Sequence, residues 1–97
     1  MTSANPDLRA LVKHAQRKDR LDEDPDRTMD EIATTCCVNR SHLFELMAGK
    51  TEPSRVRSWT VHRLAKGLDQ PAEVVSEAIR VSRRRAQNRE RRKLLDD

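Results

Sequence analysis

Aromatic residues are nearly absent from this chain of 97 residues. They make up 2% of it, as one tryptophan and one phenylalanine, and hydrophobic residues of all kinds reach only 35%. The core must therefore be built from Leu, Val, Ile, Ala and Met, and the length suffices for one modest domain. The chain also has too few rings for the stacking platforms that bind single-stranded nucleic acid. We expect an all-α protein, a compact five-helix bundle without strands or internal repeats.

Further shortages exclude several classes of function. The only cysteines, Cys36 and Cys37, are adjacent, and such neighbours rarely bridge, so no disulfide framework is expected. The spacings C-x-x-C and H-x-x-x-H do not occur, so no metal site is predicted. Two glycines cannot make a glycine-rich phosphate loop, and no base accompanies a nucleophile, so we expect neither an enzyme nor a cofactor. Without a long apolar run or signal segment, the expected location is the cytoplasm, away from membranes.

Charge is abundant and unevenly distributed. Charged residues make up 37% of the chain, and the formal net charge is +4. Residues 1–79 hold twelve basic and thirteen acidic residues, whereas residues 80–97 hold eight basic and three acidic ones. We therefore divide the chain into a domain, residues 1–79, and a basic C-terminal helix extension or tail, residues 80–97. The tail is open to three readings: a solvated and partly frayed helix, a further contact with DNA phosphates, or an arginine-rich RNA-binding segment.

The outer helices are predicted from caps and apolar periodicity. The first begins at Asn5, as cap, with Pro6 at the first helical position, and runs to about Arg17 or Lys18. Polar residues 19–27 predict a loop, either a solvated insertion or an acidic patch that attracts a protein partner or repels off-target phosphate. The fourth helix follows residues 50–54, and Trp59 is interpreted as a wedge in its core. The last starts with Pro71 at its first helical position and continues into the arginine-rich end.

The central stretch, residues 28–54, predicts two short helices around a tight turn. Thr28 and Glu31 form a capping box, and Asn39 offers a second N-cap about three residues after the first helix. The inward positions follow helical spacing in both segments. They are Ile32, Ala33 and Cys36 in the first helix, and Leu43, Leu46 and Met47 in the second. Helices so close in sequence cross steeply, which is the geometry of a helix-turn-helix.

These residues resemble the lambda-repressor-like (Cro/cI-type) helix-turn-helix proteins. The matching positions are Thr28, Asp30 with Glu31, Ile32, Ala33, Cys36, Val38, Asn39, Leu43 with Leu46, Gly49, and Pro53-Ser54. Two departures stand out. Cys37 occupies a position that is usually a left-handed glycine in the family, at a cost of roughly 1 kcal/mol. Phe44 and Glu45 are unusual on a DNA-facing helix.

The resemblance implies which side chains meet DNA. The base-reading positions map onto Arg40, Ser41, Phe44 and Glu45. Arginine can hold guanine bidentately, serine bonds either kind of base, a phenyl ring rests on a thymine methyl, and glutamate accepts from cytosine. Backbone contacts, which fix register without reading sequence, are expected from a second group. That group is Thr28, Asn39, Lys50, Thr51, Ser54, Arg55 and Arg57.

We therefore expect a transcriptional regulator, a repressor that binds a double-stranded DNA operator through its third helix. A homodimer is expected through the apolar side of the last helix, formed by Val74, Val75, Ala78 and Ile79. A second reading is an antitoxin that binds a toxin protein and represses its own operon, and an antirepressor is another conceivable protein partner. A third is an architectural or RNA-binding basic protein, which would show no preference among duplex sequences.

Overall fold

The computed structural model describes residues 5–18, 20, 21 and 23–95, and these form five α-helices, one short 3₁₀ turn and no strand. The prediction of an all-α, five-helix bundle is confirmed. No helix within these residues is both long and apolar enough to cross a membrane. In chain order the elements are α1 (Leu8–Arg17), α2 (Met29–Thr35), α3 (Arg40–Met47), η1 (Pro53–Arg55), α4 (Ser58–Leu68) and α5 (Ala72–Leu95).

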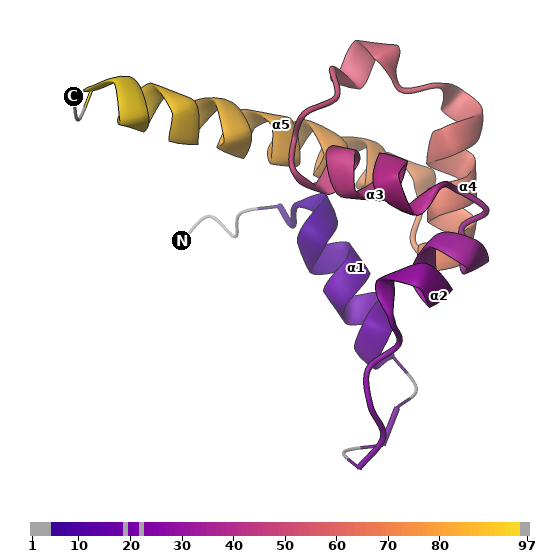
Figure 1. Ribbon diagram of the computed structural model, residues 1–97. Coiled ribbons are helices and arrows are strands. Elements are labelled where there is room, and N and C mark those ends of the chain that lie inside the picture. Colours follow the sequence, from indigo (N-terminus) through magenta and orange to yellow (C-terminus); the bar gives the residue numbers. More distant parts are fainter. Residues whose placement is uncertain (1–4, 19, 22, 96–97) are drawn as a thin grey trace.

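The core lies where the five helices meet. α5 runs along one side of the bundle, where it packs against α1, α3, α4 and η1, and its last turns project past the other helices (Figure 1). α2 packs against α1, α3 and α4. Aliphatic side chains fill the space between them, as the composition requires. The largest fully buried ones are Leu8, Val12, Ile32, Leu43, Leu46, Leu64, Leu68 and Val75.

Two helix starts differ from their predictions. The cap of α1 is Asp7 rather than Asn5, because the Asp7 carboxylate accepts from the Ala10 amide at 2.9 Å. Pro6 therefore precedes the cap. Pro71 likewise lies before α5, which begins at Ala72. The Pro71 carbonyl accepts from the Val74 and Val75 amides. Both helices therefore begin one or two residues later than expected. At α1, Asp7 is extended and its carboxylate supplies an acceptor for the first turn.

The charge boundary at residue 79 does not coincide with the end of the packed part of α5. α5 is continuous across it, and both Val81 and Ser82 are buried. The Ser82 hydroxyl accepts from the Leu8 amide at 2.9 Å, and Arg83 donates to the Gly49 carbonyl at 2.8 Å. The packed part ends at Ala86, which is half-buried, and the described side chains of residues 87–94 are all exposed. Residues 87–95 are called the arm below.

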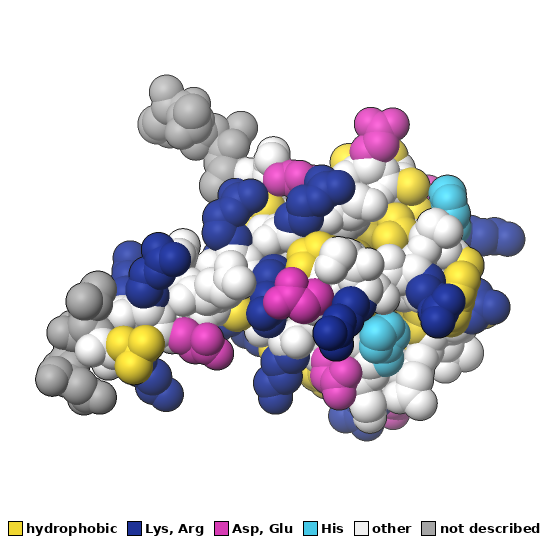
Figure 2. Space-filling view, turned by 90° about the horizontal axis from the view of Figure 1, so that it is seen from above, with side chains coloured by type: hydrophobic (Ala, Val, Ile, Leu, Met, Phe, Trp, Pro, Cys, Tyr) yellow, Lys and Arg dark blue, Asp and Glu magenta, His cyan; other side chains and the backbone are white. Residues whose placement is uncertain are grey.

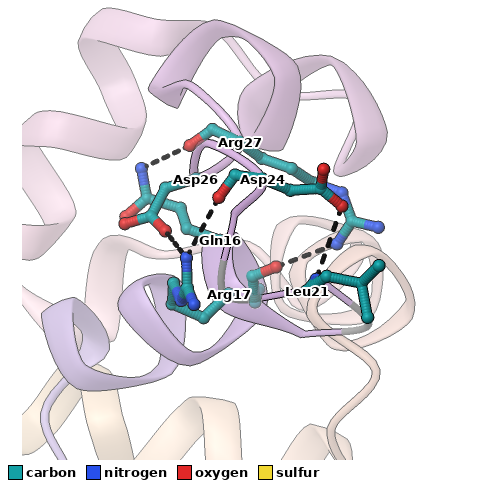
Figure 3. A network of polar contacts seen from close by, with 7 residues as sticks. Gln16, Arg17, Leu21, Asp24, Asp26 and Arg27 are labelled. Atoms are coloured by element: carbon teal, nitrogen blue, oxygen red, sulfur yellow. Dashed lines mark hydrogen bonds and ion pairs between the residues drawn. The ribbon is translucent and has the colours of Figure 1, made fainter.

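The connection between α1 and α2 is folded back on the end of α1. Arg17 lies 2.8 Å from the Asp26 carboxylate, and Gln16 donates to the Arg27 carbonyl at 2.8 Å (Figure 3). Arg27 in turn donates to the Ala15 carbonyl at 3.0 Å, which satisfies one of the last carbonyls of α1. The described residues of this segment form a loop, as predicted. The roles suggested for its acidic residues stay predictions.

Candidate nucleic-acid interface

Two N-caps and one left-handed residue set the bounds of α2 and α3. The Thr28 hydroxyl accepts from the Glu31 amide at 3.2 Å, so half of the predicted capping box forms. The Glu31 carboxylate lies 3.9 Å from Arg20 instead of returning to the Thr28 amide. Cys37 has φ 56°, which confirms the predicted left-handed position, and Asn39 caps α3 by accepting from the Ser41 amide at 2.8 Å. Local sequence therefore fixes where α3 begins.

α3 has one side in the core and one in water. Leu43 and Leu46 are fully buried, and Met47 packs partly against the same core. The four residues predicted to read bases, Arg40, Ser41, Phe44 and Glu45, are all exposed. Because the inward side chains anchor the helix, its outer face is presented on a rigid support. This arrangement suits insertion of one helix into a groove.

Arg40 is lightly held at the start of this face. Its guanidinium lies over the Phe44 ring, 5.4 Å from the centroid, and 3.4 Å from the Asp30 carboxylate. Both members of the ion pair are more than half exposed, and such pairs contribute little. Arg40 can therefore leave Asp30 for a base edge at small cost. Sequence analysis placed Asp30 among the residues of the family resemblance but not beside Arg40, because the two are on different helices and their contact depends on how α2 and α3 pack.

The residues predicted to touch phosphate fall into two groups. Thr28 and Asn39 use an oxygen as a helix cap, but the hydroxyl hydrogen of one and the amide nitrogen of the other can still donate. The second group lies between α3 and α4. There Lys50, Ser54, Arg55 and Arg57 are exposed and Thr51 is half-buried. Among the described residues none of the three basic side chains in this group has an ion-pair partner, so all three are available to an anion.

Gly49 brings the segment after α3 against α5. It has φ 73°, and a β-carbon there would lie 2.5 Å from the Ser82 carbonyl oxygen and 2.7 Å from the Ala86 β-carbon. Only glycine combines this backbone conformation with so close an approach. Arg83 then donates to the Gly49 carbonyl and pairs with Glu52 at 2.7 Å. The loop with the candidate phosphate contacts is thereby fastened to α5.

The predicted dimer face is corrected by the packing of α5. Val75 and Ala78 are wholly inaccessible and Ile79 is 3% exposed, because α5 packs against α1, α3 and α4 of the same chain. Val74 is partly buried against that core. The side chains of Val75, Ala78 and Ile79 therefore cannot also form a surface for a second copy. Whether the chain dimerises through another surface stays a prediction.

Trp59 is not a core wedge, contrary to the interpretation above. Its side chain is 51% exposed, and the neighbouring Thr60 is buried in its place. The Arg63 guanidinium stacks on the indole at 4.5 Å from the ring centroid and donates to the Cys37 carbonyl at 3.2 Å. Trp59 and Arg63 therefore lie beside the turn that precedes α3. Sequence reasoning missed this pair, although their i, i+4 spacing on one helix was visible.

The two cysteines have different surroundings. Cys36 is 1% exposed, and burial raises the pKa of its thiol to about 11. Cys36 packs against Gly67 of α4, and a β-carbon on Gly67 would lie 2.4 Å from the Cys36 sulfur. Cys37 is exposed. Nowhere in the described ranges do three or more His, Cys, Asp or Glu side chains gather as metal ligands.

Basic side chains also surround the second half of α5. Figure 2 shows them on the projecting end of the molecule, with an acidic and a hydrophobic side chain among them. Arg83 and Arg85 are bound to the body, the latter through Asp7 at 2.8 Å. The whole arrangement offers an exposed helix face flanked by cationic segments, with no partnered nucleophile or metal cluster among the described residues. Comparison with family models, curated proteins and solved structures found no match for this chain.

Proposed function

We propose that the chain is a sequence-specific double-stranded DNA-binding regulator of the lambda-repressor-like type, a cytoplasmic repressor that occupies an operator through α3. The observation that carries this proposal is the outer face of α3. It presents Arg40, Ser41, Phe44 and Glu45 to solvent, while the opposite side of the same short helix is anchored in the core. A face of this composition supplies donors, an acceptor and an apolar contact for base edges.

Charge around α3 supports the same reading. Lys50, Arg55 and Arg57 follow the helix, and Asn39 and Thr28 precede it with donors still free. Phosphate contacts on both sides would fix the helix in one register. Glu45, exposed at the centre, repels phosphate unless the groove offers a donor opposite it, so it contributes specificity by rejecting wrong sites.

The test is selection of bound duplexes from a random pool, followed by Arg40→Ala and the control Arg55→Ala. Arg40→Ala should cost roughly 1 to 3 kcal/mol on the selected site and much less on random DNA, because a bidentate guanine contact is lost. Arg55→Ala should weaken both duplexes by similar factors. Equal losses on both DNAs for Arg40→Ala would demote it to a phosphate contact, and failure to enrich any sequence would refute the proposal.

One observation favours a protein partner as the second candidate function. The exposed Trp59 ring presents a large apolar surface next to the turn before α3, and tryptophan is frequent at the centres of interfaces. Under this reading the chain is an antitoxin whose partner covers Trp59. Trp59→Ala would then abolish binding of the toxin encoded in the same operon, while the affinity for DNA would stay within about twofold. A fall in DNA affinity alone would assign Trp59 to the DNA interface.

A further inference from the structure

A second basic site lies away from the outer face of α3. It is a cavity of about 260 Å³ between the start of α1, the last turn of α3 and the middle of α5. Its lining residues are Asp7, Arg9, Met47, Ser82, Arg85 and Arg89. The N-terminal end of α1 and the middle of α5 lie side by side there, as the Asp7 to Arg85 contact shows (Figure 1). Arginines from two segments distant in sequence, Arg9 on α1 and Arg85 with Arg89 on α5, thus face one hollow.

The polar atoms around the arginines are already in use. Asp7 accepts from the Ala10 amide and from Arg85, and the Ser82 hydroxyl accepts from the Leu8 amide. The Leu8 and Ala10 amides at the start of α1 are therefore not available to a ligand. Neither Arg9 nor Arg89 has a hydrogen-bond or ion-pair partner among the described residues. Three guanidinium groups against one carboxylate leave a net charge of +2, with unused donors on all three arginines.

The register of α5 explains why the cavity is cationic. Val75 and Ser82 are buried on the packed side of the helix, and the next position seven residues on is Arg89. The side of α5 that is buried near its start is therefore basic where the helix leaves the body. An apolar partner helix could not cover it without burying unpaired charge. The chemistry of this side calls for an anion.

We propose that this cavity binds a backbone phosphate of the duplex that α3 reads, and that Arg92 contacts a neighbouring phosphate. This inference rests on the proposed function. Arg85, Arg89 and Arg92 follow the spacing i, i+4, i+7, which places them within about 60° of one another around α5 and about 10 Å apart from first to last. A DNA strand advances about 3.4 Å along the duplex axis per nucleotide, and the path between successive phosphates is longer than this rise, so the row can reach two neighbouring phosphates. Guanidinium groups bind phosphate oxygens bidentately, which lysine cannot do.

The cavity lies on the flank of α3 one turn beyond Phe44. Met47, in its lining, lies three residues after Phe44, so the two side chains occupy the same flank of α3, one turn apart. A phosphate held between Arg9 and Arg89 would thus belong to the strand bordering the groove that Phe44 enters. The first and last helices would clamp the backbone beside the reading helix. Specificity would stay with α3, because phosphate contacts carry no sequence information.

The experiment compares two double variants of the full chain that lose the same charge. Arg9→Gln with Arg89→Gln empties the cavity of its unpaired cations, whereas Arg84→Gln with Arg91→Gln removes two exposed arginines from the opposite side of α5. Affinities for selected and random duplexes are measured over a range of salt. The first variant should lower the slope of log affinity against log salt by nearly 2, at about 0.9 per contact, and keep the ratio between the two duplexes. The second should change the slope by less than about 0.5.

Equal effects of the two pairs would overturn the proposal, since the charges would then act diffusely. If the first variant keeps the salt slope of the unmodified chain and still binds its selected site, this inference is wrong and the proposed function stands. Inorganic phosphate provides a DNA-independent probe, read through the side-chain Nε signals of Arg9 and Arg89 in NMR spectra. If these signals respond to phosphate while the chain binds no duplex, the cavity serves a free phosphate compound, and both the DNA source and the proposed function are wrong. Response to phosphate together with the reduced slope supports the inference.

Discussion

The two halves of α5 form one continuous helix but differ in the contacts that stabilise them. Residues 72–86 are fixed by burial of Val75 and Ala78 and by polar contacts from Ser82 and Arg83. The described side chains of the arm make no such contacts, yet the arm continues the helix. Its residues include neither glycine nor proline and are mostly good helix formers, and propagation from an existing helix avoids the cost of nucleation. Tertiary packing therefore determines the first half, and local propensity the second.

Gly49→Ala should give the largest loss of stability in the packed half. The new β-carbon would meet the Ser82 carbonyl oxygen and Ala86 at a backbone conformation that disfavours alanine. Left-handed strain and overpacking together should lower the free energy of unfolding by about 2 to 4 kcal/mol. Urea denaturation measures this. Gln87→Ala, at the beginning of the arm, is the control and should stay within about 0.5 kcal/mol; comparable losses in both variants would remove the distinction between the halves.

Ser82→Ala should follow, because the Leu8 amide would lose its only described acceptor inside the core. An unsatisfied buried amide costs about 1 to 3 kcal/mol. The matched control is Ser76→Ala, on the same helix but with no hydrogen bond of its side chain among the described contacts. Thermal unfolding of both variants should show a lower midpoint for Ser82→Ala alone. An unchanged midpoint would mean that α1 is held to α5 by apolar contacts only.

Adjacent arginines at the border of the halves should differ in a smaller effect. Arg83→Gln loses the bond to the Gly49 carbonyl and the pair with Glu52, which should cost about 1 kcal/mol after allowance for solvent screening. Arg84→Gln should change the free energy of unfolding by less than about 0.5 kcal/mol, since its side chain is exposed. Denaturation curves of the two variants, recorded side by side, decide the matter. The prediction fails if Arg84→Gln is the more damaging.

Ending the chain after Gln87 should have the smallest effect on stability. This truncation removes the arm basic residues Arg89, Arg91, Arg92 and Lys93 and leaves Arg83 and Arg85 on the body. The free energy of unfolding should change by less than about 0.5 kcal/mol, because no described side chain beyond Ala86 is buried. Amide exchange in the intact chain should likewise be fast in the arm and slow before it. Slow exchange in the arm would reveal packing against another copy.

Local features of the fold and of the candidate site were predictable from sequence. The caps at Thr28 and Asn39 and the inward Leu43 depend on residues within one turn, so spacing alone identifies them, whereas the left-handed Cys37 was predicted from the family resemblance. The choice between Trp59 and Thr60 depended on α4 packing. Thr60 lies in line with Leu64 and Leu68, whereas Trp59 is stacked by Arg63 from the neighbouring turn.

Long-range features were not predictable. An apolar stripe such as Val75 with Ile79 shows that a face is buried, but not whether the same chain or a second copy covers it. Charge composition similarly placed a boundary at residue 79, although Arg83 and Arg85 bond to the body through groups far away in sequence. The cavity between Arg9 and Arg89 depends on the docking of the first helix on the last. No local pattern encodes that docking.

The exposed position of the single tryptophan has a spectroscopic consequence. Because half of the Trp59 side chain already meets water in the folded chain, global unfolding should shift the wavelength of its emission very little. The indole is instead linked through Arg63 to the Cys37 carbonyl, so its intensity and its access to a quencher such as acrylamide depend on the turn before α3. The tryptophan fluorescence of this chain should therefore report mainly on the conformation of the turn before α3 and only weakly on unfolding of the core.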